Sequence, residues 1–572
     1  MNLKLVIPKI KALAQRYFQT FGFILLLVLI VPTSSWLFGS GYFNMHDDLQ
    51  VMRIFEMVRC FNDNQIPCRW SPDMSNGYGQ AMFNFYSTLP YYLGFFYKLI
   101  FGASYLGTVK FLFAFSLLAG ALGMFLLAKE FWGYWGGLVS AVLYTYAPYH
   151  AVDVYVRGAL AEAFALAILP YVWLYSYRIV TRKGKYDLLA FSLSLFALFT
   201  THNISSFIYA PFTMVWVLFW IIYSKNYRSI LQLTLSGILG FGMSAFFLMP
   251  AIIEQNLVDT SLMTTIYYSY TAHFVTLYQL FISRFWGDGG STFGANDSMS
   301  FAIGWPHWWL LFLIVPVSIF WFFDKNKRLY SYLILLLTVL FFFSAFLTHS
   351  RSIFIWQHVN LMGFIQFPWR FLGLSIFFIS LAGGTVGKIF FFIKYPVVLA
   401  IIILTIFYNI SYFTPVHFSR EVTDEGKLSG LAFELQQRGG YSDYLPKGVT
   451  TAPEFVAPDG PRYVKGEGEV RNYVPRSNGF SLYVNNTSDS QIVFPYIYFP
   501  NWKASVDGSN IPVETNGAHN VIKLSVSAGE HIINTSFYDT PVRTIANLVT
   551  IASLIFFIIS FIQTSRKPSS QT

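Results

Sequence analysis

The chain has 572 residues, of which 55% are hydrophobic and only 12% are charged. Soluble domains usually carry about 25% charged residues, so the composition excludes an ordinary soluble domain and predicts a membrane protein with many spans. The net charge of +10 does not indicate nucleic-acid binding, because the basic residues lie in short loops between apolar segments, where they orient a membrane protein.

Apolar segments recur along most of the chain and predict about twelve transmembrane helices. The first follows a basic stretch and resembles a signal peptide, but it is long and no A-x-A-like site follows it, so we predict an uncleaved anchor. The predicted spans are residues 21–38, 106–128, 134–149, 158–178, 187–201, 203–223, 229–250, 305–323, 329–347, 368–388, 395–413 and 543–563.

Every second loop between these spans is basic, for example at Lys129, at Arg178–Lys185 and at Lys325–Arg328. The positive-inside rule then places both termini in the cytoplasm of a multi-pass plasma-membrane protein. Residues Tyr91–Phe101 are apolar but too short to cross and contain Lys98. Counting them as a span breaks the charge alternation, so we expect an interfacial helix on the outer face.

Three long segments fall on the predicted outer face, at residues 39–105, 254–304 and 414–542. The last is polar and rich in Gly and Pro, and alternating patches such as Gln491–Phe494 are separated by turn signals such as Asp507-Gly508. The sequence therefore predicts a transmembrane domain over 1–413, an extracytoplasmic β-rich domain over 414–542, and a last helix with a cytoplasmic tail over 543–572.

The first long segment begins with His46-Asp47-Asp48, directly after the first span. Two adjacent carboxylates can act as a general base, as metal ligands, or as both. The alternative is an ordinary acidic, solvated loop. His46 has no predicted role. A divalent cation stays open as a cofactor, because one pair of carboxylates is a small ligand set for such an ion.

Cationic and polar side chains gather at the predicted outer ends of three other spans. Arg157 and Glu162 open the fourth span, and ionisable residues at that depth usually face a cavity or a partner. An arginine there can hold a lipid phosphate, as can Arg370 at the start of the tenth span. His202, in a tight turn, can contact phosphate or sugar hydroxyls. The alternatives are a structural ion pair, interfacial snorkelling and helix capping, respectively.

Cys60 and Cys68 are the only two cysteines, and both lie in the first outer segment. Outside the cytoplasm such a pair can form a disulfide. Two cysteines without nearby histidines do not suggest a metal site. The chain has no P-loop, no dinucleotide-binding glycine fingerprint, no Gly-x-Ser-x-Gly elbow and no His-Glu-x-x-His motif.

Two regions carry a resemblance to known proteins. After the carboxylate pair come Ile66–Asp73 (IPCRWSPD), Asn76–Gly79 (NGYG) and Phe85–Tyr92 (FYSTLPYY); Tyr498–Gly508 (YFPNWKASVDG) follows near the C-terminus. The order of these motifs resembles the GT-C superfamily of polytopic glycosyltransferases. It is more similar to the YfhO-like bacterial membrane proteins and to the family labelled 6-pyruvoyl-tetrahydropterin-synthase-related, a label that implies no pterin chemistry here.

The resemblance implies an inverting glycosyltransferase that uses a polyprenyl-phosphate-linked sugar donor, with its site on the extracytoplasmic side. Arg157, Arg370 and His202, with Glu162 nearby, would bind the donor phosphate, and Asp47 or Asp48 would take a proton from the acceptor. Relatives commonly show Asp-Glu where this chain has Asp-Asp, which favours Asp47. They also often show a second Pro where this chain has Cys68.

Two other classes stay open from the sequence. A transporter or lipid flippase would also have many spans, but it should show repeated halves and charged or broken helices at the bilayer midplane. A non-catalytic cell-envelope assembly protein would use the β-rich region to bind a polymer. The sequence does not identify the sugar, the acceptor (glycan, lipid or protein), or the oligomeric state.

Overall fold

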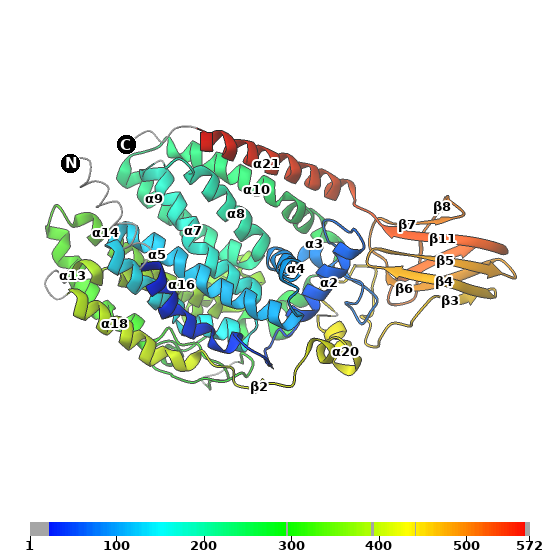
Figure 1. Cartoon of the computed structure of the whole chain (residues 1–572), viewed down its shortest axis with the longest axis horizontal. Helices are drawn as coiled ribbons and strands as arrows, with labels where there is room; N and C mark the ends of the chain where they lie inside the picture. The colour runs from blue at the N-terminus through cyan, green and yellow to red at the C-terminus, as the bar shows by residue number, and fades with distance from the viewer. Residues whose placement is uncertain (1–21, 183, 293–295, 390–393, 441, 567–572) are drawn as a thin grey trace, which may run out of the picture.

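The computed structural model describes residues 22–182, 184–292, 296–389, 394–440 and 442–566. It is elongated, with a helical bundle whose one end carries a separate β structure (Figure 1). Helices α2 (Gln50–Asn62), α4 (Leu89–Phe101) and α20 (Gly430–Arg438) lie near that same end. We refer to it below as the loop end of the bundle.

Nine helices in the described residues are long and apolar enough to cross a membrane. Two further apolar helices are shorter, at Gly22–Leu37 and Asp187–Thr201 (α8). The spans are formed by α5 (Tyr105–Thr145), α7 (Leu160–Thr181), α9 (Asn203–Ser224), α10 (Ser229–Ile253), α12 (Trp305–Trp309) with α13 (Leu311–Phe323), α14 (Arg328–Thr348), α16 (Leu372–Gly383) with α17 (Val386–Ile389), α18 (Lys394–Asn409) and α21 (Pro541–Arg566).

Helix α5 accounts for two of the predicted spans. Its 41 residues would extend about 60 Å as one helix, but Gly133 inside it has a φ of 73° and a ψ of −175°, which is not helical. A Cβ added to Gly137 would lie 2.9 Å from the carbonyl oxygen of Phe125, so the chain folds back on itself at Gly133. Nine long helices, two short ones and the second half of α5 make twelve segments, and the predicted fold class is confirmed.

The short helices of the loop end follow local sequence signals. Helix α4 begins with Pro90 in its first turn and ends at Gly102, whose φ of 62° suits a residue without a side chain. It covers the segment predicted as an interfacial helix. The other short elements between spans are α3 (Met82–Phe85), α6 (Pro148–Ala151), a π-helical turn at Val152–Val156, α11 (Leu277–Phe281), α15 (Ile353–His358) and α19 (Asp424–Lys427).

The β structure is a sandwich of two antiparallel sheets. One has the strand order β3-β6-β10-β9 and the other β4-β5-β11-β7-β8. Phe480 of one sheet stacks on Phe494 of the other with ring centroids 4.4 Å apart, which marks the shared core. The strands are β3 (Arg462–Lys465), β4 (Gly468–Arg476), β5 (Gly479–Asn486), β6 (Ser490–Ile497), β7 (Trp502–Val506), β8 (Ser509–Ile511), β9 (Glu514–Asn516), β10 (Val521–Val526) and β11 (Gly529–Phe537).

The sandwich starts later than the sequence predicts. Residues 414–461 hold α19, α20 and connecting loops, and the described ones among them join neither sheet of the sandwich. Near their start, β2 (Phe418–Ser419) pairs with β1 (Tyr42–Phe43) just ahead of the Asp47-Asp48 loop. The third long segment is therefore part of the loop end as well as the lead into the sandwich.

A buried polar cluster joins the sandwich to the bundle. Arg543, at the start of α21, pairs with Glu254 through Nε at 2.9 Å, and Arg69 pairs with Asp539 at 3.0 Å. Asn84 donates to Glu254 at 2.9 Å, and Arg69 also donates to Asn84 at 3.1 Å. These residues come from the first long segment, the end of α10 and the link between β11 and α21. We call Arg69, Glu254, Asp539 and Arg543 the anchor cluster.

Candidate functional site

Asp47 is fixed by backbone pairing between the first long segment and the residues before α7. The amide of His46 donates to the carbonyl of Val156, and the amide of Asp47 donates to that of Arg157, both at 2.9 Å. This close approach of the two backbone segments requires a glycine at position 158, where φ is 63° and a Cβ would lie 2.2 Å from Sδ of Met45. Two regions that the sequence places more than a hundred residues apart therefore meet at Asp47.

The Asp47 carboxylate is held by α2. Its Oδ2 accepts from Arg53 at 2.7 Å and from Gln50 at 3.1 Å. The Arg53 guanidinium lies 4.2 Å above the ring of Tyr86, and Tyr91 donates to Oε1 of Gln50 at 2.7 Å. The Asp47 side chain is 34% exposed and that of Arg53 is 8% exposed. Asp47 thus presents an oriented, partly accessible carboxylate.

Asp48 has a different environment from its neighbour. Its carboxylate forms an ion pair with Lys427 of α19, and Oδ1 is buried without a hydrogen-bond partner in the described part of the chain. Burial raises the pKa of Asp48 more than Lys427 lowers it. The contact ties the first long segment to the third. The two aspartates are similarly exposed, at 34% for the side chain of Asp47 and 30% for that of Asp48.

Arg157, Glu162 and Arg370 lie together, and Arg157 and Glu162 form the ion pair that the sequence analysis gave as the alternative to phosphate binding. Glu162 Oε2 lies 2.8 Å from an Nη of Arg157 and 3.6 Å from Nε of Arg370. Asp153, in the π-helical turn, also pairs with Arg157. Tyr149 donates to Oε1 of Glu162 at 2.5 Å. We call Asp153, Arg157, Glu162 and Arg370 the arginine cluster.

The two arginines differ in how fully they are bonded. The Arg157 guanidinium is paired with two carboxylates and lies 4.5 Å above the ring of Trp369. Arg370 donates from Nη1 to the carbonyl of Ile365 at 2.7 Å, while its buried Nε makes no hydrogen bond within the described residues. A buried donor without an acceptor is costly, so Arg370 keeps a hydrogen-bonding capacity that Arg157 has already used.

Two tyrosines connect the arginine cluster with Asp47. Burial raises the pKa of Tyr268, and among the charges acting on that tyrosine are Asp443, Asp47 and Arg370. Burial also raises the pKa of Tyr444, which is acted on by Asp443, Arg53 and Arg370. Asp47 and Arg370 therefore act electrostatically on the same tyrosine, Tyr268, at the same end of the bundle.

Asp443 is a member of this site that the sequence analysis missed. It lies beyond α20 in the third long segment, and burial raises its pKa to about 6, with Arg53 lowering it and Asp47 raising it. Nothing in the local sequence distinguishes it from an acidic turn residue, because its surroundings come from the first and second long segments. No sequence signal of the kind used here would have found it.

His202 and Asn203 serve the turn between α8 and α9. The Nδ1 atom of His202 accepts from the amide of Ser205 at 3.3 Å and caps α9, as the alternative reading predicts. Asn203 donates to the carbonyl of Phe85 at 3.3 Å. Glu162 and Arg370 act electrostatically on His202, so its ring lies near the arginine cluster while it caps the helix.

The remaining sequence-predicted residues have clear places. Cys60 and Cys68 form a disulfide, as predicted. His46, left without a role by the sequence, contacts the carbonyl oxygen of Asp288 with Nε2 at 2.7 Å, which joins the first and second long segments. Among the described residues, no group of three or more His, Cys, Asp or Glu side chains could hold a metal ion.

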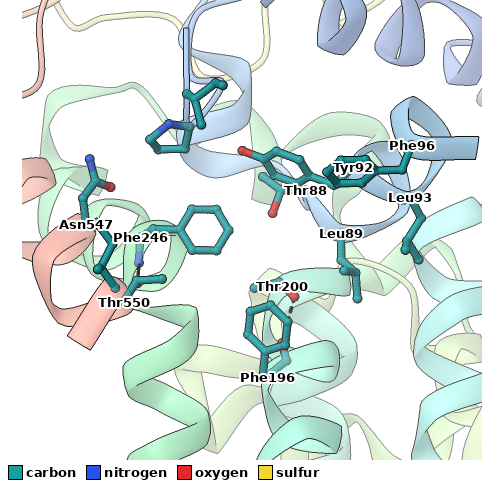
Figure 2. A pocket seen from close by; sticks show the side chains of 13 residues that line it. Thr88, Leu89, Tyr92, Leu93, Phe96, Phe196, Thr200, Phe246, Asn547 and Thr550 are labelled. Atoms are coloured by element: carbon teal, nitrogen blue, oxygen red, sulfur yellow. Dashed lines mark hydrogen bonds between the residues drawn. The ribbon is translucent and has the colours of Figure 1, made fainter. Parts of the chain in front are cut away.

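A largely apolar cavity of about 460 Å³ lies between α4, α8, α10 and α21. Figure 2 shows Tyr92 and Phe96 of α4 on one side and Phe246 and Asn547 on another. Tyr91, the neighbour of Tyr92, contacts Gln50 beside Asp47, so α4 separates the cavity from the site. Its lining residues are Ile66, Pro67, Thr88, Leu89, Tyr92, Leu93, Phe96, Phe196, Thr200, Phe246, Asn547, Thr550 and Ile551.

Comparison with known proteins identifies part of the chain. Residues 83–296 match the family described as the 6-pyruvoyl-tetrahydropterin synthase related domain, a membrane protein family. The resemblance predicted from the sequence is therefore confirmed. An uncharacterised protein of Lactococcus lactis is 22% identical over 240 residues, which is 40% of this chain. That match spans 39% of the relative's own length.

Solved structures of three membrane glycosyltransferases are similar at low identity. The mycobacterial arabinofuranosyltransferase AftD gives 12% identity and a TM-score of 0.42, over 71% of this chain and 29% of that chain. The oligosaccharyltransferase of Archaeoglobus fulgidus gives 13% and 0.35, over 72% and 59%. ArnT of Cupriavidus metallidurans, bound to undecaprenyl phosphate, gives 12% and 0.30, over 65% and 78%. At these values no activity is transferred to this chain.

Proposed function

We propose that this protein is a membrane glycosyltransferase that moves a sugar from a polyprenyl-phosphate-linked donor to an extracytoplasmic acceptor, with inversion. The observation that carries the proposal is the meeting, at the loop end, of an accessible carboxylate with a pair of arginines. Asp47 is held by Arg53, and Arg157 and Arg370 share Glu162 nearby. A carboxylate suits the acceptor hydroxyl and arginines suit a phosphate.

The arginine cluster is suited to a phosphate that develops charge during the reaction. In the free protein Glu162 Oε2 lies 2.8 Å from Arg157 and 3.6 Å from Arg370. A donor phosphate would bind at Arg370, whose Nε lacks an acceptor, and Arg157 would add a second positive charge. As the bond between the sugar and the phosphate breaks, its electron pair goes to the phosphate, where both arginines stabilise it.

In this proposal Asp47 would contact the acceptor on the side of the sugar opposite the phosphate. Its partly exposed carboxylate would bind the acceptor hydroxyl as that oxygen attacks the anomeric carbon. Attack opposite the leaving phosphate inverts the configuration of that carbon. Because a lipid phosphate is a competent leaving group, positioning and one proton acceptor supply most of what the reaction needs.

The cavity between α4, α8, α10 and α21 is suited to the hydrocarbon tail of the donor. Its lining is almost entirely apolar, and hydrocarbon is the ligand that such a surface favours. Tyr92 lines the cavity, and its neighbour Tyr91 donates to Gln50 beside Asp47. The proposal therefore places the tail on one side of α4 and the reacting groups on the other.

The test replaces Asp47 and Asp48 singly by Asn after membrane expression is confirmed. Undecaprenyl-phosphate-linked radiolabelled monosaccharides serve as donors, and membranes of the expressing cells serve as the acceptor source. We expect Asp47→Asn to lower transfer by about 10²–10⁴-fold and Asp48→Asn to lower it less, because Lys427 holds Asp48. Full activity in both variants would sink the assignment.

A second measurement addresses the donor side of the site. Purified protein is titrated with undecaprenyl phosphate, and binding is compared between the wild type and variants of Arg157 and Arg370. Weaker binding in both variants supports their role. Unchanged binding would remove the two arginines from the phosphate site while leaving the role of Asp47 to be judged from the transfer assay.

A further inference from the structure

Asp443 is held in place by the backbone of the second long segment. Its own amide donates to the carbonyl of Gly440 at 2.9 Å. Just beyond it, the amide of Asp259 donates to the carbonyl of Leu445 at 2.8 Å, and the amide of Lys447 donates to that of Leu257 at 3.0 Å. These hydrogen bonds therefore attach the loop that carries Asp443 to the second long segment.

The same loop packs against both ends of the first long segment. A Cβ added to Gly439 would lie 2.4 Å from Cδ2 of Leu49, the residue after Asp48. The ring of Tyr444 stacks on Phe85 with centroids 5.5 Å apart, beside the Tyr86 ring that covers Arg53. These contacts place Asp443 between the start of α2 and the segment before α4, over the Asp47–Arg53 pair.

The three carboxyl groups at this place differ in their partners. Asp47 is paired with Arg53 and Asp48 is paired with Lys427. Asp443 has no hydrogen bond or ion pair of its side chain among the described residues. The charged and titratable groups that face it are Arg53 and Asp47 from the first long segment, Tyr268 from the second and its neighbour Tyr444.

A proton acceptor works best when its pKa lies near the working pH. Burial raises the pKa of Asp443 to about 6. The Asp47 carboxylate is already bonded to Arg53 and Gln50, and that of Asp48 is bonded to Lys427. Asp443 therefore combines a raised pKa with a carboxyl group that has no partner among the described residues.

We propose that Asp443 is a second catalytic carboxyl group of this site, which takes the proton of the acceptor hydroxyl while Asp47 stays paired with Arg53 and orients that hydroxyl. This inference rests on the proposed glycosyl transfer. The O–H bond of the acceptor breaks and its proton moves to a carboxylate oxygen of Asp443. The acceptor oxygen bonds to the anomeric carbon, and the bond from that carbon to the phosphate oxygen breaks with its electron pair.

The experiment measures initial transfer rates between pH 4.5 and 8 with the labelled undecaprenyl-phosphate donors and membrane acceptors described above. The variants are Asp443→Asn, Asp443→Glu and, as a matched control, Asp459→Asn, which changes an exposed aspartate of the same segment. We expect the wild-type rate to rise with pH through about 6. Asp443→Asn should lower the rate by at least about 100-fold and abolish the rise.

The other variants separate catalysis from folding. Asp443→Glu should keep a pH-dependent rise with a displaced midpoint, and Asp459→Asn should behave as the wild type. Residual activity of Asp443→Asn that keeps the wild-type rise would show a structural role and overturn the inference. If Asp443→Asn fails to accumulate in membranes, the profile of Asp443→Glu decides: a midpoint identical to that of the wild type overturns the inference.

The outcomes also distinguish this inference from the proposed function. Full activity of Asp443→Asn together with an inactive Asp47→Asn overturns the role of Asp443 and leaves glycosyl transfer standing. A wild-type protein that transfers no sugar from any donor in the panel overturns the proposed function, and the role of Asp443 fails with it.

Discussion

The anchor cluster and the candidate site both contain arginine–carboxylate pairs, but their carboxyl groups differ in how fully they are bonded. In the anchor cluster Glu254 accepts from Arg543, Asn84 and Thr540, and Asp539 pairs with Arg69. Each region also has a buried arginine nitrogen without a hydrogen bond in the described part of the chain, Arg543 Nη2 in the anchor cluster and Arg370 Nε in the site. The difference lies in Asp443 of the site, whose carboxyl group is unpaired among the described residues.

The largest expected effect breaks the anchor cluster. Glu254→Gln removes the charge that pairs with Arg543, whose side chain is fully buried, and an uncompensated buried charge costs about 3–5 kcal/mol. We expect a corresponding loss in the free energy of unfolding, measured by denaturant titration of the detergent-solubilised protein. The double variant Glu254→Gln, Arg543→Met should recover much of that loss. Wild-type stability of the single variant would contradict this view of the cluster.

The next effect is a pH dependence of the free energy of unfolding that arises from Asp443 in the site. The pKa of Asp443 is about 6 in the folded protein against an ordinary value of 3.8, so its contribution to stability is fully present below pH 3.8 and is lost as pH rises through 6. A shift of this size corresponds to roughly 3 kcal/mol. Asp443→Asn should flatten the fall in unfolding free energy between about pH 4 and 6. An equally steep fall in that variant would show that other groups cause it.

Removal of the disulfide, which lies next to Arg69 of the anchor cluster, should lower the free energy of unfolding by a smaller amount. Cys60 and Cys68 are eight residues apart, and closing so short a loop stabilises by about 2.5 kcal/mol in the chain-entropy model. The double Ser variant should lose about that much unfolding free energy. Unchanged unfolding free energy in that variant would contradict a stabilising role of this disulfide.

The smallest effect should appear in the donor-binding half of the site. Arg370→Gln removes one charged hydrogen-bond donor and leaves Glu162 paired with Arg157. Hydrogen bonds to charged groups are worth about 1.5–3 kcal/mol, so we expect the donor KM to rise by about 10–100-fold with little change in stability. Arg351→Gln, at an exposed position, is the matched control. Equal effects in the two variants would argue against a specific phosphate contact.

Much of the fold follows from the sequence because its signals are local. Apolar length predicts the spans. It also predicts the turn at Gly133, which lies within the residue range of α5. Alternating patches and Asp-Gly or Asn-Gly turns predict the strands, and β10 covers the patch Val521–Val526. The start of the sandwich was predicted too early, because residues 414–461 are polar loops whose partners lie in the bundle and not in the sheets.

The candidate site likewise has features that follow from local sequence and features that depend on the tertiary structure. The sequence by itself determined the chemical types at the ends of spans, the cysteine pair, and the placement of Asp47, Asp48, Arg157, Glu162 and Arg370 as charged residues next to apolar helices. Only the tertiary structure decided that Lys427 binds Asp48, that Arg53 binds Asp47, and that Asp443 joins them. A side chain's pairing and basicity depend on burial and on charges that are distant in sequence, which no local pattern encodes.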